Sequence, residues 1–344
     1  MTAVATPPGA DAAAARGYSP EDRARALVEA LPYIQRFRGA IVVVKMGGNA
    51  MGDGESARTF AEDIVMLRSV GLKPVVVHGG GPQIDDLLRR LGKTSEFHNG
   101  LRVTDAETLE VARMVLVGKV GRDIVGQINV HGAYAVGLSG EDGNLITAEV
   151  RQPELGYVGE VTEVRPGIIQ RLLAEDMIPV ISSIGSAAGG QPLNINADTV
   201  AGAVGGALGA EKVIYLTNVP GLLTDVNDPS TLVPRVTLAE LDAAIADGTI
   251  SGGMVPKVAS CMAAVRAGAV SAHMLDGRIP HVLLLELFTD AGIGTMVVGD
   301  HPENEVVGDH PENEVVGDHP ESEVVGDHPE SPSEDPTTTT PGGN

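Results

Sequence analysis

The sequence predicts an α/β fold organised around a mainly parallel sheet. Between residues 40 and 299, short apolar runs typical of strands alternate with longer stretches of helical periodicity. Strands that are apolar on both faces and joined by helices form parallel sheets covered on both sides. Two of these runs end in glycines, at 47–48 and 79–81. Ligands of such sheets bind at the carboxyl ends of the strands, so we expect the functional site there.

The apolar runs and the helical stretches follow one another in an ordered alternation. Strands are predicted at 40–46, 74–79, 133–140, 178–185, 212–218 and 281–288, and a last strand at 294–299. Helices are predicted at 57–71, 83–92 and 198–210. The small residues of the third helix indicate close packing beneath a site.

A further helical stretch precedes the first strand, at residues 18–39. Ser19, Pro20 and Asp22 form a helix start, and Pro32 should kink the helix. Leu27, Leu31 and Ile34 give it an apolar stripe. The helix either packs on its own domain or forms an arm that reaches a neighbouring subunit. Residues 1–18 are predicted to be a disordered leader.

The composition indicates a globular protein with an aliphatic core. Apolar residues make up 43% of the 344 residues and aromatic residues only 3%, with no Trp. The single cysteine, Cys261, excludes an intramolecular disulfide and is expected to be a buried side chain. No run of 18 apolar residues predicts a membrane span, and the N-terminus lacks the pattern of a secretory signal. We therefore expect a cytoplasmic protein.

The net charge of −22 is concentrated near the C-terminus. From Asp300 onward there are 13 acidic residues and no Lys or Arg, which leaves a net charge of −9 for residues 1–299. A nine-residue unit, VVGDHPENE, recurs with small changes over 297–331, and we predict an acidic, disordered low-complexity tail at 300–344. The mildly acidic remainder argues against nucleic-acid and membrane partners, so local cations must hold any anionic ligand.

Two glycine-rich strand ends, KMGG at 45–48 and HGGGPQI at 78–84, indicate a polyanion site. Glycines there let backbone N–H groups approach a ligand, and a following helix adds its dipole. A Walker A loop is excluded, because Leu87 stands where the first glycine before Gly92 would be required. The dinucleotide-binding fingerprint is also absent after the first strand.

Two later segments carry further polar candidates. Asn194, Asn196 and Asp198 alternate in LNINADTVA and lead into a helix that Asp198 is expected to cap. Lys257 lies beside a glycine turn in SGGMVPKVAS, near the start of another helix. Taken alone, Asp198 could be only a cap and Lys257 only an exposed lysine.

The motifs together resemble those of the N-acetylglutamate kinases in the amino-acid kinase family. The resemblance covers residues 19–299 and rests on six segments in this order: VVVKMGG, VVVHGGGPQI, NGLRVTD, LNINADTVA, YLTNVPGLLTD and SGGMVPKV. It implies a three-layer sandwich around the sheet, preceded by an N-terminal helix arm at 19–39. It also implies a kinase domain at 40–299, with an acetylglutamate-binding lobe at about 40–205 and a nucleotide-binding lobe at about 206–299.

The resemblance also implies roles for individual residues. Lys45 and Lys257 would contact the transferring phosphoryl group, and Asp198 would orient both ammonium groups. Gly48 and Gly81 would donate backbone N–H bonds to the phosphoryl oxygens. The substrate would be bound by Gly80, Gly81, Arg102 and Asn194. The nucleotide and its phosphates would be bordered by Gly47, Gly48, Tyr215, Thr217, Asn218, Gly221 and Leu222.

The implied reaction needs no general base. A side-chain carboxylate, with a pKa of about 4.3, is already ionised at neutral pH when it attacks ATP. Catalysis then consists of positioning and electrostatic stabilisation, which two lysines and glycine N–H groups can provide. The product would be N-acetyl-L-glutamyl 5-phosphate. Mg²⁺ is expected to arrive with ATP, and no protein metal site is expected.

The N-terminal helix and the segment 273–295 resemble the arginine-inhibited branch of this family. That resemblance implies a homohexamer built as a trimer of dimers, with L-arginine as inhibitor. Lys212, His273, Glu286 and Gly292 would line the arginine site, where Glu286 could pair with a guanidinium. Without an effector, His273 and Glu286 would be only a surface pair near a loop.

Three other functions stay open from the sequence. One is an acyl-phosphate-forming kinase of the same family that uses a different small acid. Another is a regulatory protein that binds arginine or nucleotide without turnover, although Lys45, Asp198 and Lys257 are all present. A third is an accessory role through binding of a nitrogen-signalling protein.

Overall fold

The computed structural model describes residues 19–47, 54–98, 100–290 and 292–300. Within them, an eight-stranded sheet has the order β12-β14-β13-β11-β1-β2-β8-β5. The strands are β1 Ile41–Met46, β2 Lys73–His78, β5 Ala135–Ser139, β8 Ile178–Ser182, β11 Lys212–Thr217, β12 Arg235–Thr237, β13 Ser271–Asp276 and β14 Thr295–Val298. From β5 to β13 every neighbouring pair is parallel, and β14 runs antiparallel to β13. The predicted mainly parallel sheet is confirmed.

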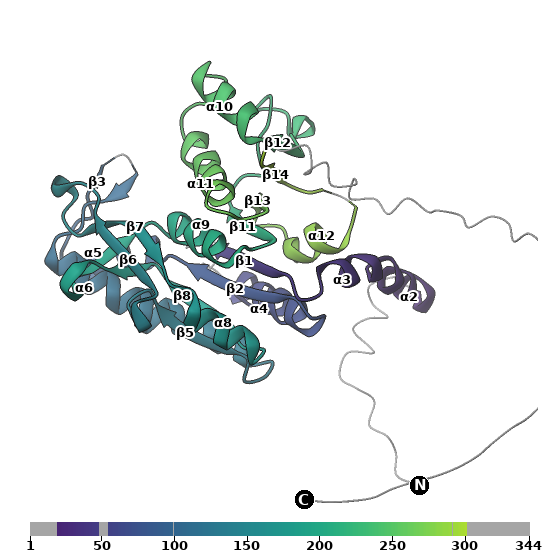
Figure 1. The fold of residues 1–344 in the computed structure, drawn as a ribbon, viewed down its shortest axis with the longest axis horizontal. Helices are drawn as coiled ribbons and strands as arrows, with labels where there is room; N and C mark the ends of the chain where they lie inside the picture. Colours follow the sequence, from purple (N-terminus) through teal and green to yellow (C-terminus); the bar gives the residue numbers. More distant parts are fainter. Residues whose placement is uncertain (1–18, 48–53, 99, 291, 301–344) are drawn as a thin grey trace, which may run out of the picture. The chain divides into compact units, whose positions relative to one another are not determined.

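Helices cover both faces of this sheet (Figure 1). Along β1, Val42, Val44 and Met46 belong to one apolar core, whereas Val43 belongs to the other. The first core is completed by α3 Leu31–Phe37, α4 Gly54–Ser69, α5 Gly81–Arg90, α6 Ala106–Arg113, α7 Gly121–Asn129 and α12 Val282–Phe288. The second is completed by α8 Gly167–Ala174, α9 Ala197–Leu208, α10 Leu238–Ala246 and α11 Met254–Arg266. The sheet and the helices on its two faces therefore form three layers, as expected.

Smaller elements surround the carboxyl ends of the strands. A closed four-stranded barrel is formed by β6 Ile146–Val150, β7 Val158–Val164, β9 Ile184–Ser186 and β10 Pro192–Ile195. A hairpin is formed by β3 Phe97–His98 and β4 Leu101–Arg102. A π-helix, η2 Met114–Val120, joins α6 to α7, and 3₁₀ turns lie at Asp142–Asn144, Pro153–Leu155, Ala188–Gly190 and Pro229–Thr231.

One predicted strand is wrong, because residues 281–288 form helix α12 rather than a strand. A short apolar run cannot be assigned by periodicity alone, and this one contains four leucines and one glutamate but a single β-branched residue. Its buried side chains, Val282, Leu283, Leu287 and Phe288, lie on one helical face against the first core. The predicted strand 178–185 also divides: β8 stays in the sheet and β9 leaves it for the barrel.

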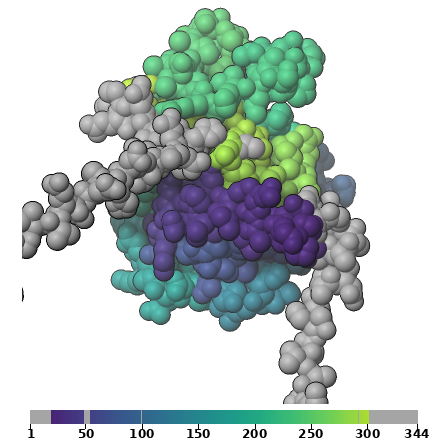
Figure 2. All heavy atoms as spheres, turned by 90° about the vertical axis from the view of Figure 1, so that its right-hand side faces the viewer, coloured from purple at the N-terminus to yellow at the C-terminus, as the bar shows by residue number. Residues whose placement is uncertain are grey.

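The N-terminal arm consists of α2 Pro20–Glu29 and α3, which meet at Ala30. Ser19 and Asp22 form a reciprocal capping box, as expected from the sequence. Figure 2 shows the arm beside α12, where Tyr33 and Phe37 of α3 are buried in the first core. In contrast, α2 has no buried residue, and the Leu27 side chain is 68% exposed. The arm is therefore anchored by α3, while α2 presents apolar side chains to solvent.

The small residues predicted to allow close packing do so along α9. A Cβ atom at Gly202 would lie 3.0 Å from the Tyr215 hydroxyl, and one at Gly206 would lie 2.5 Å from the carbonyl oxygen of Ala267. At Gly205 it would collide with Val213 of β11. These glycines let α9 press against β11 and α11, which fixes the start of α9 over the sheet.

The remaining predictions concern Cys261, membrane-spanning helices, the two ends of the chain and the lobe boundary. Cys261 is buried, as expected. No helix in the described ranges is both long and apolar enough to span a membrane. The leader, Gly48 and all of the tail beyond Asp300 lie outside the described residues, and the boundary between the two lobes stays a prediction.

Candidate active site

The first feature of the site is an ion pair between the end of β1 and the start of α9. The Lys45 ammonium lies 2.8 Å from Oδ1 of Asp198, and their side chains are 16% and 31% exposed. In the sheet, Lys45 of β1 lies opposite Val77 of β2 on one side and opposite Tyr215 of β11 on the other. Lys45 is therefore near the centre of the sheet. The pair is therefore rigidly placed but open to a ligand.

The expected cap of α9 is wrong by two residues. Asn196, not Asp198, is the N-cap, and its side-chain oxygen accepts a 2.7 Å hydrogen bond from the backbone N–H of Asp198. An asparagine at this position satisfies an N–H group that the helix leaves unpaired. Because Asn196 caps the helix, the Asp198 carboxylate is available to Lys45.

The glycine turn between β2 and α5 lies beside this ion pair. Gly80 precedes the first residue of α5, Gly81, so the unpaired N–H groups of the first helical turn begin here. A Cβ atom at Gly80 would lie 2.8 Å from Cδ2 of Leu116 in η2, and one at Gly79 would lie 3.3 Å from Cβ of Ala197. The turn is held between two helices, and a side chain at Gly80 would require Leu116 to move.

These elements enclose a cavity of about 240 Å³. It brings together residues predicted from distant segments as substrate-binding or catalytic. Its lining comprises Lys45, Gly79, Gly80, Gly81, Ile84, Phe97, Gly100, Leu101, Arg102, Leu116, Val158, Ser183, Asn194, Ile195, Asn196, Ala197 and Asp198. The lining therefore contains two cationic side chains and the N–H groups of the glycine turn, together with amide, carboxylate and aliphatic groups. A small acid with a polar substituent suits such a cavity.

Arg102 and Asn194 are both oriented by neighbouring side chains. The Arg102 side chain is 7% exposed and donates hydrogen bonds to Asp85, Ser95 and the carbonyl oxygen of Gly81. The Asn194 amide donates a 3.3 Å hydrogen bond to the hydroxyl of Thr104, which is fully buried. Both predicted substrate residues are thus held in place before any ligand arrives.

Lys257 lies in the first turn of α11 and is half-buried. The residues that line the cavity do not include it. The hydroxyl of Tyr215 connects the two helices, because its single proton is shared between the carbonyl oxygens of Ser260 in α11, at 3.1 Å, and Asp198 in α9, at 3.4 Å. The approach of Lys257 to the phosphoryl group stays a prediction.

The predicted nucleotide residues follow the carboxyl ends of β1 and β11. Thr217 donates a hydrogen bond to the carbonyl oxygen of Val219, and Asn218 is exposed. Gly221 is buried against Thr295, whose hydroxyl also accepts a hydrogen bond from the N–H of Leu222. Tyr215 is only 3% exposed, and burial raises the pKa of its hydroxyl. Gly47 lies two residues after Lys45. Nucleotide contact at all these residues stays a prediction.

Lys212, His273 and Glu286 form a buried cluster, which excludes the alternative of an exposed surface pair. Nδ1 of His273 lies 2.7 Å from Oε1 of Glu286, and the two side chains are 1% and 8% exposed. The N–H next to Gly292, that of Ile293, donates to Oε2 of Glu286. Burial acts to raise the pKa of Glu286, but the hydrogen bond to His273 and the charges of His273 and Lys212 outweigh burial. The pKa of Glu286 is therefore below its usual value.

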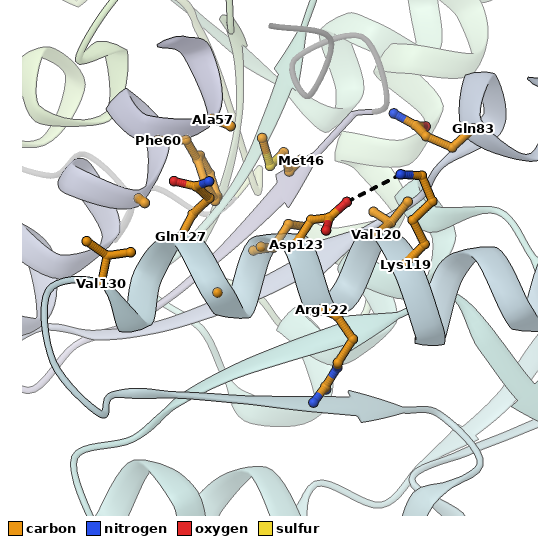
Figure 3. A pocket seen from close by; sticks show the side chains of 13 residues that line it. Met46, Ala57, Phe60, Gln83, Lys119, Val120, Arg122, Asp123, Gln127 and Val130 are labelled. Carbon is orange, nitrogen blue, oxygen red and sulfur yellow. Dashed lines mark ion pairs between the residues drawn. The ribbon is translucent and has the colours of Figure 1, made fainter. Parts of the chain in front are cut away.

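A second cavity, of about 430 Å³, lies between α4 and α7 (Figure 3). Its walls include Met46 and Phe60, and Lys119 and Asp123 form an ion pair at 3.7 Å beside it. Of the described residues that were predicted from the sequence for substrate or nucleotide binding, none lines it.

Sequence reasoning missed several residues of the site. Phe97, Leu116, Val158 and Ser183 line the cavity but follow no chemical motif. Asp85 follows the glycine turn by four residues, a spacing that places its side chain on the helix face above Gly81. That spacing could have identified Asp85, whereas the π-helix that carries Leu116 has no sequence signal.

Comparisons with known proteins agree with this fold. The amino acid kinase family model matches residues 40–276. An acetylglutamate kinase of Synechococcus sp. is 53% identical over 279 residues, which cover 81% of this chain and 93% of that relative. One from Corynebacterium urealyticum is 50% identical over 301 residues, covering 86% and 98%. The chain therefore belongs to the amino acid kinase family, and within it to the acetylglutamate kinases.

A solved structure extends the likeness to the fold. N-acetylglutamate synthase from Neisseria gonorrhoeae, complexed with coenzyme A and N-acetyl-glutamate, is 26% identical and superposes with a TM-score of 0.71. The match covers 81% of this chain and spans 64% of the length of that one.

Acid should destabilise the fold through His78, the last residue of β2. Its side chain is fully buried, Nδ1 donates to the carbonyl oxygen of Gly79, and burial lowers its pKa to about 4. Because the unfolded imidazole takes up a proton near pH 6.5, the unfolded state binds more protons between pH 6.5 and 4. Stability should therefore fall over this range by about 3 kcal/mol.

Urea unfolding of the wild type and His78→Gln between pH 4 and 7 measures this effect. Asp63, whose pKa burial raises to about 6, acts in the opposite direction, but it is present in both proteins and cancels in their difference. The stability advantage of the wild type should shrink as the pH falls. A difference that does not change with pH would contradict the assignment.

Proposed function

We propose that this chain transfers the γ-phosphoryl group of ATP to the side-chain carboxylate of N-acetyl-L-glutamate, an early step of arginine biosynthesis. The observation that carries the proposal is that Lys45, Gly81 and Arg102 line one cavity. Two cationic side chains in one cavity suit a dicarboxylic acid. The relatives named acetylglutamate kinase support the same substrate.

The proposal gives each of these residues a role. Lys45, held by Asp198, would bind the oxygens of the transferring phosphoryl group, and Lys257 would approach from α11. Gly48, Gly80 and Gly81 would offer backbone N–H groups to the same oxygens or to the substrate. Arg102 would bind a carboxylate, and Asn194 would hydrogen-bond the substrate backbone or acetamide. Charge that develops on the phosphoryl oxygens is stabilised by donors already in place.

The nucleotide would lie along the segment that follows β11, from Tyr215 to Leu222. Mg²⁺ would be held mainly by the phosphates of ATP, since no three His, Cys, Asp or Glu side chains of the described ranges gather as a metal cluster. When bound, the ion neutralises charge on those phosphates. We place the reaction in the cytoplasm.

We further propose that L-arginine inhibits the enzyme and that the chain forms a hexamer, a trimer of dimers. The buried acid of Glu286 faces Lys212 and His273, beside Gly292, and Lys212 also lies 5.1 Å from the Phe37 ring of the arm. A ligand at this cluster would therefore contact both the sheet and the arm. The exposed apolar face of α2 supports an arm that packs on another subunit.

A coupled assay of ADP release with ATP and Mg²⁺ tests the reaction. N-acetyl-L-glutamate, L-glutamate, L-aspartate and carbamate are compared, each with and without L-arginine. We expect turnover with N-acetyl-L-glutamate alone, suppressed by arginine. Turnover with another acid would replace the substrate but keep the phosphoryl chemistry, and no turnover with any acid would favour a binding-only protein.

Removal of residues 1–29 should convert the hexamer to dimers and weaken arginine inhibition. This deletion takes away α2, which has no buried residue, and keeps α3 with its core contacts. Light scattering gives the particle mass, and deletion of residues 1–18 alone serves as the control that retains the hexamer. An intact hexamer after the longer deletion would contradict the role of the arm.

A further inference from the structure

We infer that Asp85 and Ser95 are positioning residues that fix the guanidinium of Arg102 in the orientation that receives the substrate carboxylate. The inference deepens the proposed function and rests on the substrate role proposed there for Arg102.

The cavity by itself does not fix the direction of Arg102. This residue ends β4, in a two-stranded hairpin outside the central sheet, and its long side chain has many rotamers. An arginine loses affinity for a carboxylate when it must be ordered at the moment of binding. A site that binds well needs the guanidinium held in advance.

Four contacts hold it here. Nη1 donates to Oδ1 of Asp85 and to the Ser95 hydroxyl at 2.5 Å, and Nη2 donates to the carbonyl oxygen of Gly81 at 3.2 Å. The Phe97 ring lies 4.7 Å from the guanidinium carbon and covers one face. Ser95 in turn donates to the same Asp85 oxygen, so the three side chains form one network.

The network lies behind the guanidinium, away from the ligand. Of the described residues, Arg102, Gly81 and Phe97 line the cavity, whereas Asp85 and Ser95 do not. A guanidinium has five N–H donors, and the contacts to Asp85, Ser95 and Gly81 use three of them. The remaining two are enough for a bidentate carboxylate.

The negative charge of Asp85 strengthens its hydrogen bond with Arg102. Burial raises the pKa of the Asp85 carboxyl, but hydrogen bonds from Arg102 and Ser95 outweigh burial and lower that pKa below its usual value. Asp85 is therefore ionised at neutral pH, and its bond to Arg102 is charge-assisted. The bond to Gly81, which lines the same cavity, also connects Arg102 to the glycine turn.

The neighbouring residue, Asp86, provides a matched control. It is on the same helix and 51% exposed, against 40% for Asp85, but it pairs with Arg89 on the surface. Asp85→Ala should raise the KM for N-acetyl-L-glutamate roughly tenfold, corresponding to one charge-assisted hydrogen bond. The KM for ATP and kcat should stay within about twofold, and Asp86→Ala should change none of the three.

Conservative variants separate positioning from general stability. Asp85→Asn keeps an oxygen that accepts from Arg102 and Ser95, so its KM should lie between those of the wild type and Asp85→Ala. Ser95→Ala should show a smaller rise with the same selectivity for the acid over ATP. A loss of kcat in Asp85→Ala, or an equal rise in both KM values, would overturn the inference in favour of a structural role.

Arg102→Ala is measured in the same experiment. If its KM for N-acetyl-L-glutamate is unchanged, the substrate role of Arg102 fails, and the inference fails with it. If Arg102→Ala raises that KM while Asp85→Ala behaves like Asp86→Ala, the inference alone is overturned and the proposed function stands.

Discussion

The ion pair between Lys45 and Asp198 is the interaction on which the rest of the site depends. It joins the end of the central strand β1 to the first turn of α9, so the ammonium group is fixed on a rigid scaffold. Asn196 caps α9 and leaves the Asp198 carboxylate available. The position of α9 depends in turn on glycines that allow its contact with β11 and α11. Small residues deep in the second core thus determine where a cation stands at the surface.

Local placement of cations is essential because the protein as a whole repels anions. Residues 1–299 carry a net charge of −9, yet both ATP and a dicarboxylic acid are negative. The structure resolves this conflict with two fixed cations, Lys45 and Arg102, that line one cavity together with the glycine turn and its N–H groups. Each cation is held by a carboxylate, Asp198 or Asp85, which orients it without filling the cavity.

Much of this fold follows from local sequence. Continuous apolar runs predicted β1, β2, β8 and β11, and the glycines after them marked the correct edge of the sheet. Prediction failed at residues 281–288, because an apolar run of that length suits a buried strand or a buried helix equally, and packing against α3 and α4 decides between them.

Tertiary contacts could not be read from the sequence in the same way. The cap of α9 was assigned to the wrong polar residue, since Asn196 and Asp198 are both good caps and only the backbone conformation selects one. The barrel strands are short and irregular, and the contact of Gly80 with the π-helix joins segments far apart in the chain. The polar residues of the cavity, such as Lys45, Arg102 and Asn194, could be predicted by resemblance, but the contacts that orient them could not.

The most direct test of the account is the steady-state kinetics of Asp198→Asn. This change keeps the shape of the side chain and removes the charge that fixes Lys45. The account predicts that kcat falls on the order of 10²-fold while the KM values for both substrates change little, because the ion pair acts on the transition state. An unchanged kcat with a raised KM would show that the pair only assists binding, and would contradict the central role given to it here.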